Sequence, residues 1–176
     1  MTPAFVIHHN SSTDREEIVQ DIVKKTGATI VQSILLPNRK LGCTASHIHC
    51  AKMAKSLYPL KHYLVFEDDC VLSEDWRSCI EGLEMVDVVY LGYNDKCSHT
   101  TFGTHALLIS PKARDKIIEE ADKLKDEVID KGAFDHILSL LCRREGLLTA
   151  LPKLEDKERW AVQKKGLISL ITGRAR

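Results

Sequence analysis

Three consecutive acidic residues, Glu67, Asp68 and Asp69, directly follow the apolar run "YLVF" in the middle of the chain. Neighbouring carboxylates repel one another, so a cluster of this kind is stabilised by a positive partner. Carboxylate oxygens are hard ligands that suit Mg²⁺ or Mn²⁺ better than Zn²⁺, and these ions often bind substrate phosphates as well. The cluster therefore favours a divalent-metal site for a phosphate ester. Solvated loop carboxylates, or caps of the helix expected after Ser73, are the simpler alternative.

A second group of metal-ligating residue types lies in "GCTASHIHCAKMAKSLY", which contains Cys43, His47, His49 and Cys50. On a helix His47 and His49 point in different directions, because successive residues are rotated by about 100°. Cys43 and Cys50 share a face but lie about 10.5 Å apart along the axis, too far for one tetrahedral ion. This spacing argues against zinc. A core helix with a buried histidine explains the segment, unless Ser46 and His47 bind a ligand near the helix start.

The segments that position these residues alternate between short apolar runs and amphipathic stretches. The expected strands cover residues 4–9, 28–36, 62–67, 86–92 and 105–110, with 147–152 as a further candidate. The expected helices cover residues 14–26, 44–58, 73–83, 111–125 and 133–145. This order predicts an α/β fold with a mostly parallel central sheet flanked by helices on both faces. Ligands bind at the carboxyl ends of strands in such sheets, which is where the acidic cluster lies.

Several residues mark the ends of the expected helices. Ser12 or Thr13 is expected to cap the first helix, and Gly27 to end it. Ser73 is expected to cap the helix that follows the acidic cluster. Ser110 and Pro111 are expected as cap and first-turn residues of a later helix. The apolar stripe of that helix consists of Ala113, Ile117, Ala121, Leu124 and Val128.

Composition limits the function classes that remain. The 176 residues suit one domain, and 25 Lys and Arg balance 25 Asp and Glu, so no positive field favours nucleic acid. No apolar run reaches the roughly 18 residues of a membrane span, and the first residues lack a signal-peptide pattern. We therefore expect a cytoplasmic protein whose six cysteines are reduced and mostly buried. The tail "KKGLISLITGRAR" fits contact with an anionic membrane surface, and a packed terminal helix explains it equally well.

The stretch "GCTASHIHCAKMAKSLYPLKHYLVFEDDCVL" resembles the core of glycosyltransferase family 25. This family includes bacterial lipopolysaccharide and lipooligosaccharide glycosyltransferases and the related collagen galactosyltransferase domains. The resemblance rests on Gly42 with Cys43, the Ser46-His47 pair on a helix, and an apolar strand ending in Glu-Asp-Asp. Three later segments are also similar to the family: "VDVVYLG", "FGTHALLISPKARDKII" and "GAFDHIL". The segment "FVIHHNSSTDR" is a weaker match, because His8 stands where the family usually has Asn.

The resemblance implies a single GT-A-like domain over residues 1–176 that transfers a sugar, with galactose expected, from a UDP-sugar. The acceptor would be a glycan of lipopolysaccharide type, a lipid-linked acceptor or a protein, and the transfer would invert the anomeric carbon. Asp69, supported by Glu67, would ligate Mn²⁺ or Mg²⁺ at the two donor phosphates. The implied donor-binding residues are Ile7, His8, Gly42, Ser46, His47, Asp68 and His105.

The resemblance also implies Asp135 as the catalytic base, because the family has an aspartate at a late helix start. A carboxylate that only stabilises the helix dipole explains Asp135 nearly as well. His136 is a candidate third metal ligand. The chain is short for the family, so a degenerate member that binds a nucleotide-sugar or a partner without catalysis is an alternative. A metal-dependent phosphoesterase is a third hypothesis, although it predicts more His and Asp at other strand ends.

Overall fold

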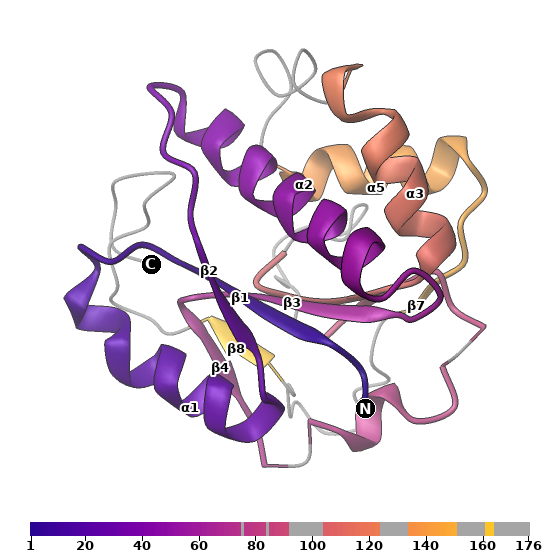
Figure 1. Cartoon of the computed structure of the whole chain (residues 1–176). Helices are drawn as coiled ribbons and strands as arrows, with labels where there is room; N and C mark the ends of the chain where they lie inside the picture. Colours follow the sequence, from indigo (N-terminus) through magenta and orange to yellow (C-terminus); the bar gives the residue numbers. More distant parts are fainter. Residues whose placement is uncertain (75, 84, 92–103, 124–133, 151–160, 164–176) are drawn as a thin grey trace.

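The fold is built on a mixed sheet of short apolar strands. The computed structural model describes residues 1–74, 76–83, 85–91, 104–123, 134–150 and 161–163 (Figure 1). Within these residues the central sheet has six strands in the order β2-β1-β3-β6-β5-β7. They are β1 (Ala4–His8), β2 (Thr29–Gln32), β3 (Tyr63–Glu67), β5 (Val88–Tyr90), β6 (Ala106–Ile109) and β7 (Thr149–Ala150). β1 pairs in parallel with β2 and β3, as β5 does with β7, whereas β6 is antiparallel to β3 and β5.

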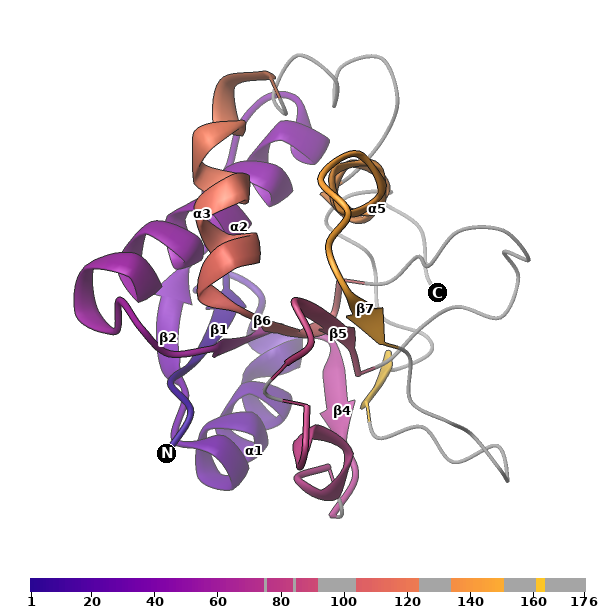
Figure 2. The same cartoon turned by 90° about the vertical axis from the view of Figure 1, so that its right-hand side faces the viewer.

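Helices cover both faces of this sheet. α1 (Glu16–Thr26) lies on one face, and α2 (Arg39–Leu57), α3 (Pro111–Glu119) and α5 (Phe134–Arg144) lie on the other (Figure 2). A separate antiparallel pair joins β4 (Cys70–Leu72) to β8 (Ala161–Gln163). The predicted fold class, an α/β domain with a mostly parallel sheet between helical layers, is confirmed. The reversed direction of β6 was not predicted from the sequence pattern.

The core is divided by the sheet into two layers, because alternate residues of a strand point to opposite faces. Under α2, α3 and α5 the strands contribute Phe5, Ile7, Tyr63, Val65, Val88, Tyr90, Leu107 and Ile109. Toward α1 they contribute Ala4, Val6, Leu64, Phe66, Val89, Ala106 and Leu108. Both sets are buried, which is why these strands are apolar along their whole length rather than alternating with polar residues.

The loop between β2 and α2 differs from the expectation. β2 ends at Gln32 rather than at Leu36, and α2 begins at Arg39 rather than near Thr44. The reason is Asn38, whose side chain accepts hydrogen bonds from the backbone of Lys40 and Leu41 and caps the helix. The helix start therefore lies one turn earlier, and Gly42 and Cys43 belong to its first turns.

The helix expected over residues 73–83 is wrong. The segment begins directly after β4. Among its described residues, only a short 3₁₀ turn forms, at Ser78–Ile80. The ring of the buried Trp76 packs edge-on against Phe66 at 6.4 Å between centroids. This tertiary contact, together with the pairing of β4 with β8, outweighs the local helical pattern.

The other helix ends agree in part with the sequence. Ser110 caps α3 by accepting from the backbone of Ala113, and Pro111 is its first residue, as predicted. α3 ends at Glu119, earlier than expected. Of its predicted apolar stripe, Ala113, Ile117 and Ala121 are buried. Residues 124 and 128 lie outside the described residues. Gly27 ends α1 with φ +71° as predicted, but the Ser12 side chain makes no capping hydrogen bond.

The cysteines that the structure describes are as expected from the sequence. None of the four cysteines whose side chains are described (Cys43, Cys50, Cys70 and Cys142) forms a disulfide, and the last three are buried. Burial raises the pKa of Cys50 and of Cys142 to about 12, so both are neutral thiols.

Among the described residues, no helix has both the length and the hydropathy to cross a membrane. The basic tail at residues 164–176 lies outside the described residues.

Candidate functional site

The candidate site lies where β1 and β3 end side by side. The two strands are parallel neighbours in a register that pairs Ile7 with Glu67, so the residues that follow them are also adjacent. Ile7 is buried in this pair and His8 is buried one residue later. The pairing brings His8 next to the acidic cluster, although 60 residues separate His8 from Asp68. The cluster lies at the carboxyl end of a strand, as predicted.

Asp68 is held in a buried ion pair. It accepts a hydrogen bond from Nδ1 of His8 at 3.0 Å and another from the guanidinium of Arg15. The Asp68 and Arg15 side chains are only 6 and 5% exposed. Arg15 ends the 3₁₀ turn (Thr13–Arg15) that leads into α1. The positive partner of the middle carboxylate is therefore an arginine of the protein itself, and this pair fastens the start of α1 to the end of β3.

Glu67 has different partners, which come from the other side of β3. Its Oε1 accepts a hydrogen bond from Oγ1 of Thr104 at 2.6 Å and lies 3.2 Å from Nε2 of His47. Its backbone N–H donates to the carbonyl oxygen of His105 at 2.9 Å. Burial alone raises the pKa of Glu67, but the bonds from His47 and Thr104 and the charges of His47 and His105 outweigh it and lower the pKa to about 2. Glu67 is therefore a carboxylate at neutral pH.

His47 connects the acidic cluster to α5. Its imidazole is buried and stacks on Phe134, with 4.3 Å between ring centroids and 11° between ring planes. No hydrogen-bond partner of Nδ1 is found in the part of the chain that the structure describes. Since the carboxylate of Glu67 can only accept, Nε2 of His47 is the nitrogen that donates in this contact. The expected core histidine thus has a second role, because it orients a carboxylate at the strand end.

Asp135 lies next to this contact, since it directly follows Phe134 in the first turn of α5. Its Oδ1 accepts from the backbone N–H of His136 at 2.8 Å, as expected for a carboxylate at a helix start. Together with burial and Cys142, the charge of Asp135 raises the pKa of Tyr90, which places the carboxylate near β5. The stacking of Phe134 on His47 brings the start of α5 to the acidic cluster. The role of Asp135 as a base stays a prediction.

Gly42 and Ser46 contact the segment after β2. A Cβ atom at Gly42 would lie 2.5 Å from the carbonyl oxygen of Ile34 and 3.2 Å from the backbone nitrogen of Leu36, so only glycine fits. The buried hydroxyl of Ser46 donates to the carbonyl of Gly42 and accepts from the backbone of Ile34, both at 2.8 Å. These contacts hold the loop against α2, and direct binding of a donor by either residue stays a prediction.

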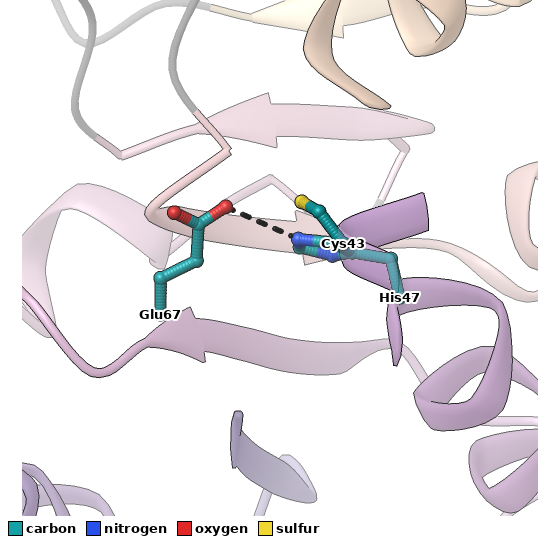
Figure 3. Close-up of side chains that lie close together, drawn as sticks. All are labelled: Cys43, His47 and Glu67. Atoms are coloured by element: carbon teal, nitrogen blue, oxygen red, sulfur yellow. Dashed lines mark hydrogen bonds and ion pairs between the residues drawn. The ribbon is translucent and has the colours of Figure 1, made fainter. Parts of the chain in front are cut away.

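Cys43 joins His47 and Glu67 in a cluster of metal-ligating side chains. The thiol sulfur, an imidazole nitrogen and a carboxylate oxygen all lie within 4.8 Å of one another. Figure 3 shows the sulfur and the carboxylate of Glu67 on the same side of the His47 ring, with its nitrogen facing the carboxylate. The spacing of Cys43 and Cys50 excluded one ion between those two residues. It could not show that a strand from elsewhere in the chain brings Glu67 to Cys43 and His47.

Asp69 and His105 complete the predicted set. Asp69 is buried, with 5% of its surface exposed, in the turn between β3 and β4, and His105 is buried just before β6. The antiparallel pairing of β3 with β6, in which Phe66 lies opposite Ala106, brings His105 and Thr104 beside Glu67. The sequence reasoning missed Arg15, Thr104 and Phe134 as site residues. The segments "TDR", "GTHA" and "AFDH" that contain them had been noted only as similar to the family.

The donor set of the acidic cluster fits a hard divalent ion through two of its three carboxylates. Asp68 is bound to Arg15 and His8, so it is unsuited to ligate a metal. Glu67 and Asp69 offer carboxylate oxygens at the end of β3, the ligand type that Mn²⁺ and Mg²⁺ prefer. Metal binding itself stays a prediction.

Comparison with known proteins shows the fold. No family model matches the sequence, and no curated protein matches it. Its structure is similar to a glycosyltransferase involved in the glycosylation of the major capsid of PBCV-1, with TM-score 0.61 and 9% identity over 85% of this chain and 81% of that one. It is also similar to the apo-form glycosyltransferase GlyE of Streptococcus pneumoniae TIGR4, with TM-score 0.50 and 12% identity over 85% of this chain and 45% of that one.

A third similar structure, with TM-score 0.51, is assigned as a glucose-1-phosphate thymidylyltransferase from Bacillus anthracis, in complex with sucrose. The identity is 11%, and the match covers 90% of this chain and 69% of that one. The proteins with this architecture thus include glycosyltransferases and a nucleotidyltransferase. At these identities the likeness concerns the fold alone, which is that of a GT-A-like α/β domain.

Proposed function

We propose that this protein is a glycosyltransferase that moves a sugar from a UDP-sugar donor to a glycan acceptor. The observation that carries the proposal is the junction of β1 and β3, where His8, Glu67, Asp68 and Asp69 meet at the carboxyl end of a GT-A-like sheet. Nucleotides bind at this end of open α/β sheets. The family 25 resemblance of the same residues supports the choice of a nucleotide-sugar over other phosphate esters.

In this proposal each carboxylate has a separate task. Asp69 and Glu67 would hold Mn²⁺ or Mg²⁺, which when bound neutralises charge on the leaving diphosphate. Asp68 keeps the β1 end in place through His8 and Arg15, so that Ile7 and His8 can contact the base of the nucleotide. His47 and Thr104 hold Glu67 in its ionised form. His105, whose backbone carbonyl accepts from the N–H of Glu67, would line the donor site.

Asp135 would act as the base that takes the proton from the acceptor hydroxyl. Inverting transfer requires a base on the face opposite the leaving diphosphate. Phe134, stacked on His47, positions the first turn of α5 at the acidic cluster, and Asp135 is partly exposed there. A base held in this way would meet the acceptor in a fixed orientation, which is how orientation contributes to rate.

The test is an assay of UDP release from a panel of UDP-sugars with Mn²⁺, beginning with UDP-galactose. We expect release with at least one donor and a loss of about 100-fold or more in Asp135→Asn, since general-base catalysis contributes about 10²–10⁴-fold. The matched control is Asp115→Asn on α3, a partly exposed carboxylate far along the chain from the cluster. Binding of UDP-sugar without turnover on any acceptor or on water would instead indicate the degenerate, binding-only member.

The proposal also covers the kind of acceptor and the family to which the protein belongs. We propose a family 25 relative acting in glycan or lipopolysaccharide synthesis, on the cytoplasmic side of a membrane. Mass analysis of products formed with lipid-linked and protein acceptors would distinguish these classes. Binding of the full chain to anionic vesicles, compared with neutral ones, would test contact with a membrane surface.

A further inference from the structure

The cluster of Cys43, His47 and Glu67 contains three different ligand types from two elements. Cys43 and His47 are four residues apart on α2, so they lie on one face of the helix, and Glu67 ends β3. Their ligand atoms all lie within 4.8 Å of one another. The side chains therefore converge before any ion is added, as Figure 3 shows. This convergence depends on the packing of α2 over the end of β3.

The distances suit a single tetrahedral ion. Two nitrogen or oxygen ligands at about 2.1 Å from such an ion lie about 3.4 Å apart. Nε2 of His47 and Oε1 of Glu67 already lie 3.2 Å apart. Cys43 is only partly buried, so its side chain can move the short distance by which the sulfur must approach. The hydrogen bond between His47 and Glu67 therefore has nearly the geometry that a metal would require.

The ligand types select the metal. A thiolate and an imidazole favour zinc over magnesium or manganese, and zinc is also bound by carboxylates. We propose that Cys43, His47 and Glu67 form a binding site for a single zinc ion, which shares Glu67 with the hard-ion site proposed at Asp69 and differs from it in its thiolate and imidazole ligands. Three protein ligands leave one coordination position open for water or another oxygen donor.

Neighbouring side chains already hold two of the ligands. Thr104 donates to Oε1 of Glu67, and Phe134 stacks on the ring of His47. Groups of this kind around a metal ligand fix its orientation and strengthen metal binding. The protons also balance. Zinc displaces the proton of the Cys43 thiol and the proton on Nε2 of His47, so binding weakens as the pH falls.

The experiment is a titration of the full chain with Co²⁺, which reports thiolate ligation through a charge-transfer absorption in the near ultraviolet, followed by displacement with Zn²⁺. We expect one ion per chain, a thiolate-to-cobalt band in the wild type, and loss of that band in Cys43→Ala with at least tenfold weaker zinc binding. Cys50→Ala is the matched control, because Cys50 lies on the same helix and outside the cluster. It should keep the band and the affinity.

Three results would overturn the zinc site: no stoichiometric binding to the wild type, a band unchanged in Cys43→Ala, or equal losses in Cys43→Ala and Cys50→Ala. Circular dichroism of each variant verifies that it is folded, and Glu67→Gln, which keeps the shape of the side chain, gives a second variant with weaker zinc binding. The result is independent of the proposed transferase. Asp69→Asn should keep the cobalt–thiolate band, and a chain without UDP release can still show it.

Discussion

Two acidic sites at opposite ends of the central sheet use their carboxylates in different ways. Asp87 precedes β5, and its single carboxylate accepts from three donors: Ser110 Oγ at 3.0 Å, Lys112 Nζ at 3.2 Å and the backbone N–H of Leu148 at 2.9 Å. At the end of β3, Asp68 accepts from Arg15 and His8, and Glu67 accepts from His47 and Thr104. Asp69 follows them as a third consecutive carboxylate.

The difference is between a single carboxylate bonded by three donors and a row of three carboxylates at one strand end. Burial raises the pKa of Asp87, but the bonds from Leu148, Ser110 and Lys112 outweigh it and lower the pKa, so this carboxylate is stable without any ion. It joins β5 to the start of α3 and to β7. The end of β3 instead carries three consecutive carboxylates, so under the proposed function this is the end of the sheet that would bind a cation and a phosphate ester.

The largest expected effect is on activity, and it should differ between substitutions at the two ends of the central sheet. Asp69→Asn should lower turnover by about 100-fold or more, because a lost metal ligand removes several kcal/mol of charge stabilisation. Asp87→Asn, the matched replacement at the other end of the sheet, should leave turnover per folded molecule unchanged. Both are measured as UDP release with Mn²⁺ on variants shown to be folded. Equal losses in the two variants would remove the distinction between the ends.

The second effect concerns stability at Asp68. Asp68→Ala should lower the free energy of unfolding by about 3–5 kcal/mol, because it leaves the guanidinium of Arg15 buried without its carboxylate. The double variant Asp68→Ala/Arg15→Met should recover much of this loss, since it removes both charges. Urea denaturation of the wild type, of the single variants Asp68→Ala and Arg15→Met, and of the double variant measures the cycle. A loss below about 1 kcal/mol for Asp68→Ala would show that the pair contributes little.

A smaller effect is expected for Asp87→Ala. It removes three hydrogen bonds, and leaving buried donors unpaired costs about 1–3 kcal/mol of unfolding free energy. The loss should stay below that of Asp68→Ala, because the Lys112 side chain is 60% exposed and regains water. The same denaturation experiment measures it. The reverse order of the two variants would mean that the amino end of the sheet carries the more costly buried charge.

Another effect is a dependence of stability on pH through Glu67. Its pKa is about 2 in the folded chain against an ordinary value of 4.5, so the unfolded chain binds its proton first as the pH falls. The contribution of Glu67 is complete above about pH 4.5 and is lost as the pH falls toward about 2. Denaturation of the wild type and Glu67→Gln should therefore give a difference that shrinks between pH 5 and pH 2. A constant difference would contradict the lowered pKa.

Much of the fold was predictable because local chemistry and burial agree there. The apolar run at residues 62–67 becomes β3 (Tyr63–Glu67), and Ser110 with Pro111 begins α3. The helix expected at 73–83 fails because Trp76 packs on Phe66 and β4 pairs with β8. Neither contact has a local signal. The reversed direction of β6 is equally non-local, since it depends on which strands it joins.

For the candidate site, the amino-acid sequence alone was enough to place an acidic cluster at the end of a buried strand and a Ser-His pair on the helix that precedes this strand. It could not assign a partner to each acid. Arg15 reaches Asp68 because β1 and β3 are parallel neighbours, and Thr104 reaches Glu67 because β6 runs back along β3. His47 and Cys43 meet Glu67 because α2 packs over the sheet. These contacts join residues that are far apart in the chain, so they form only when the strands and helices pack together.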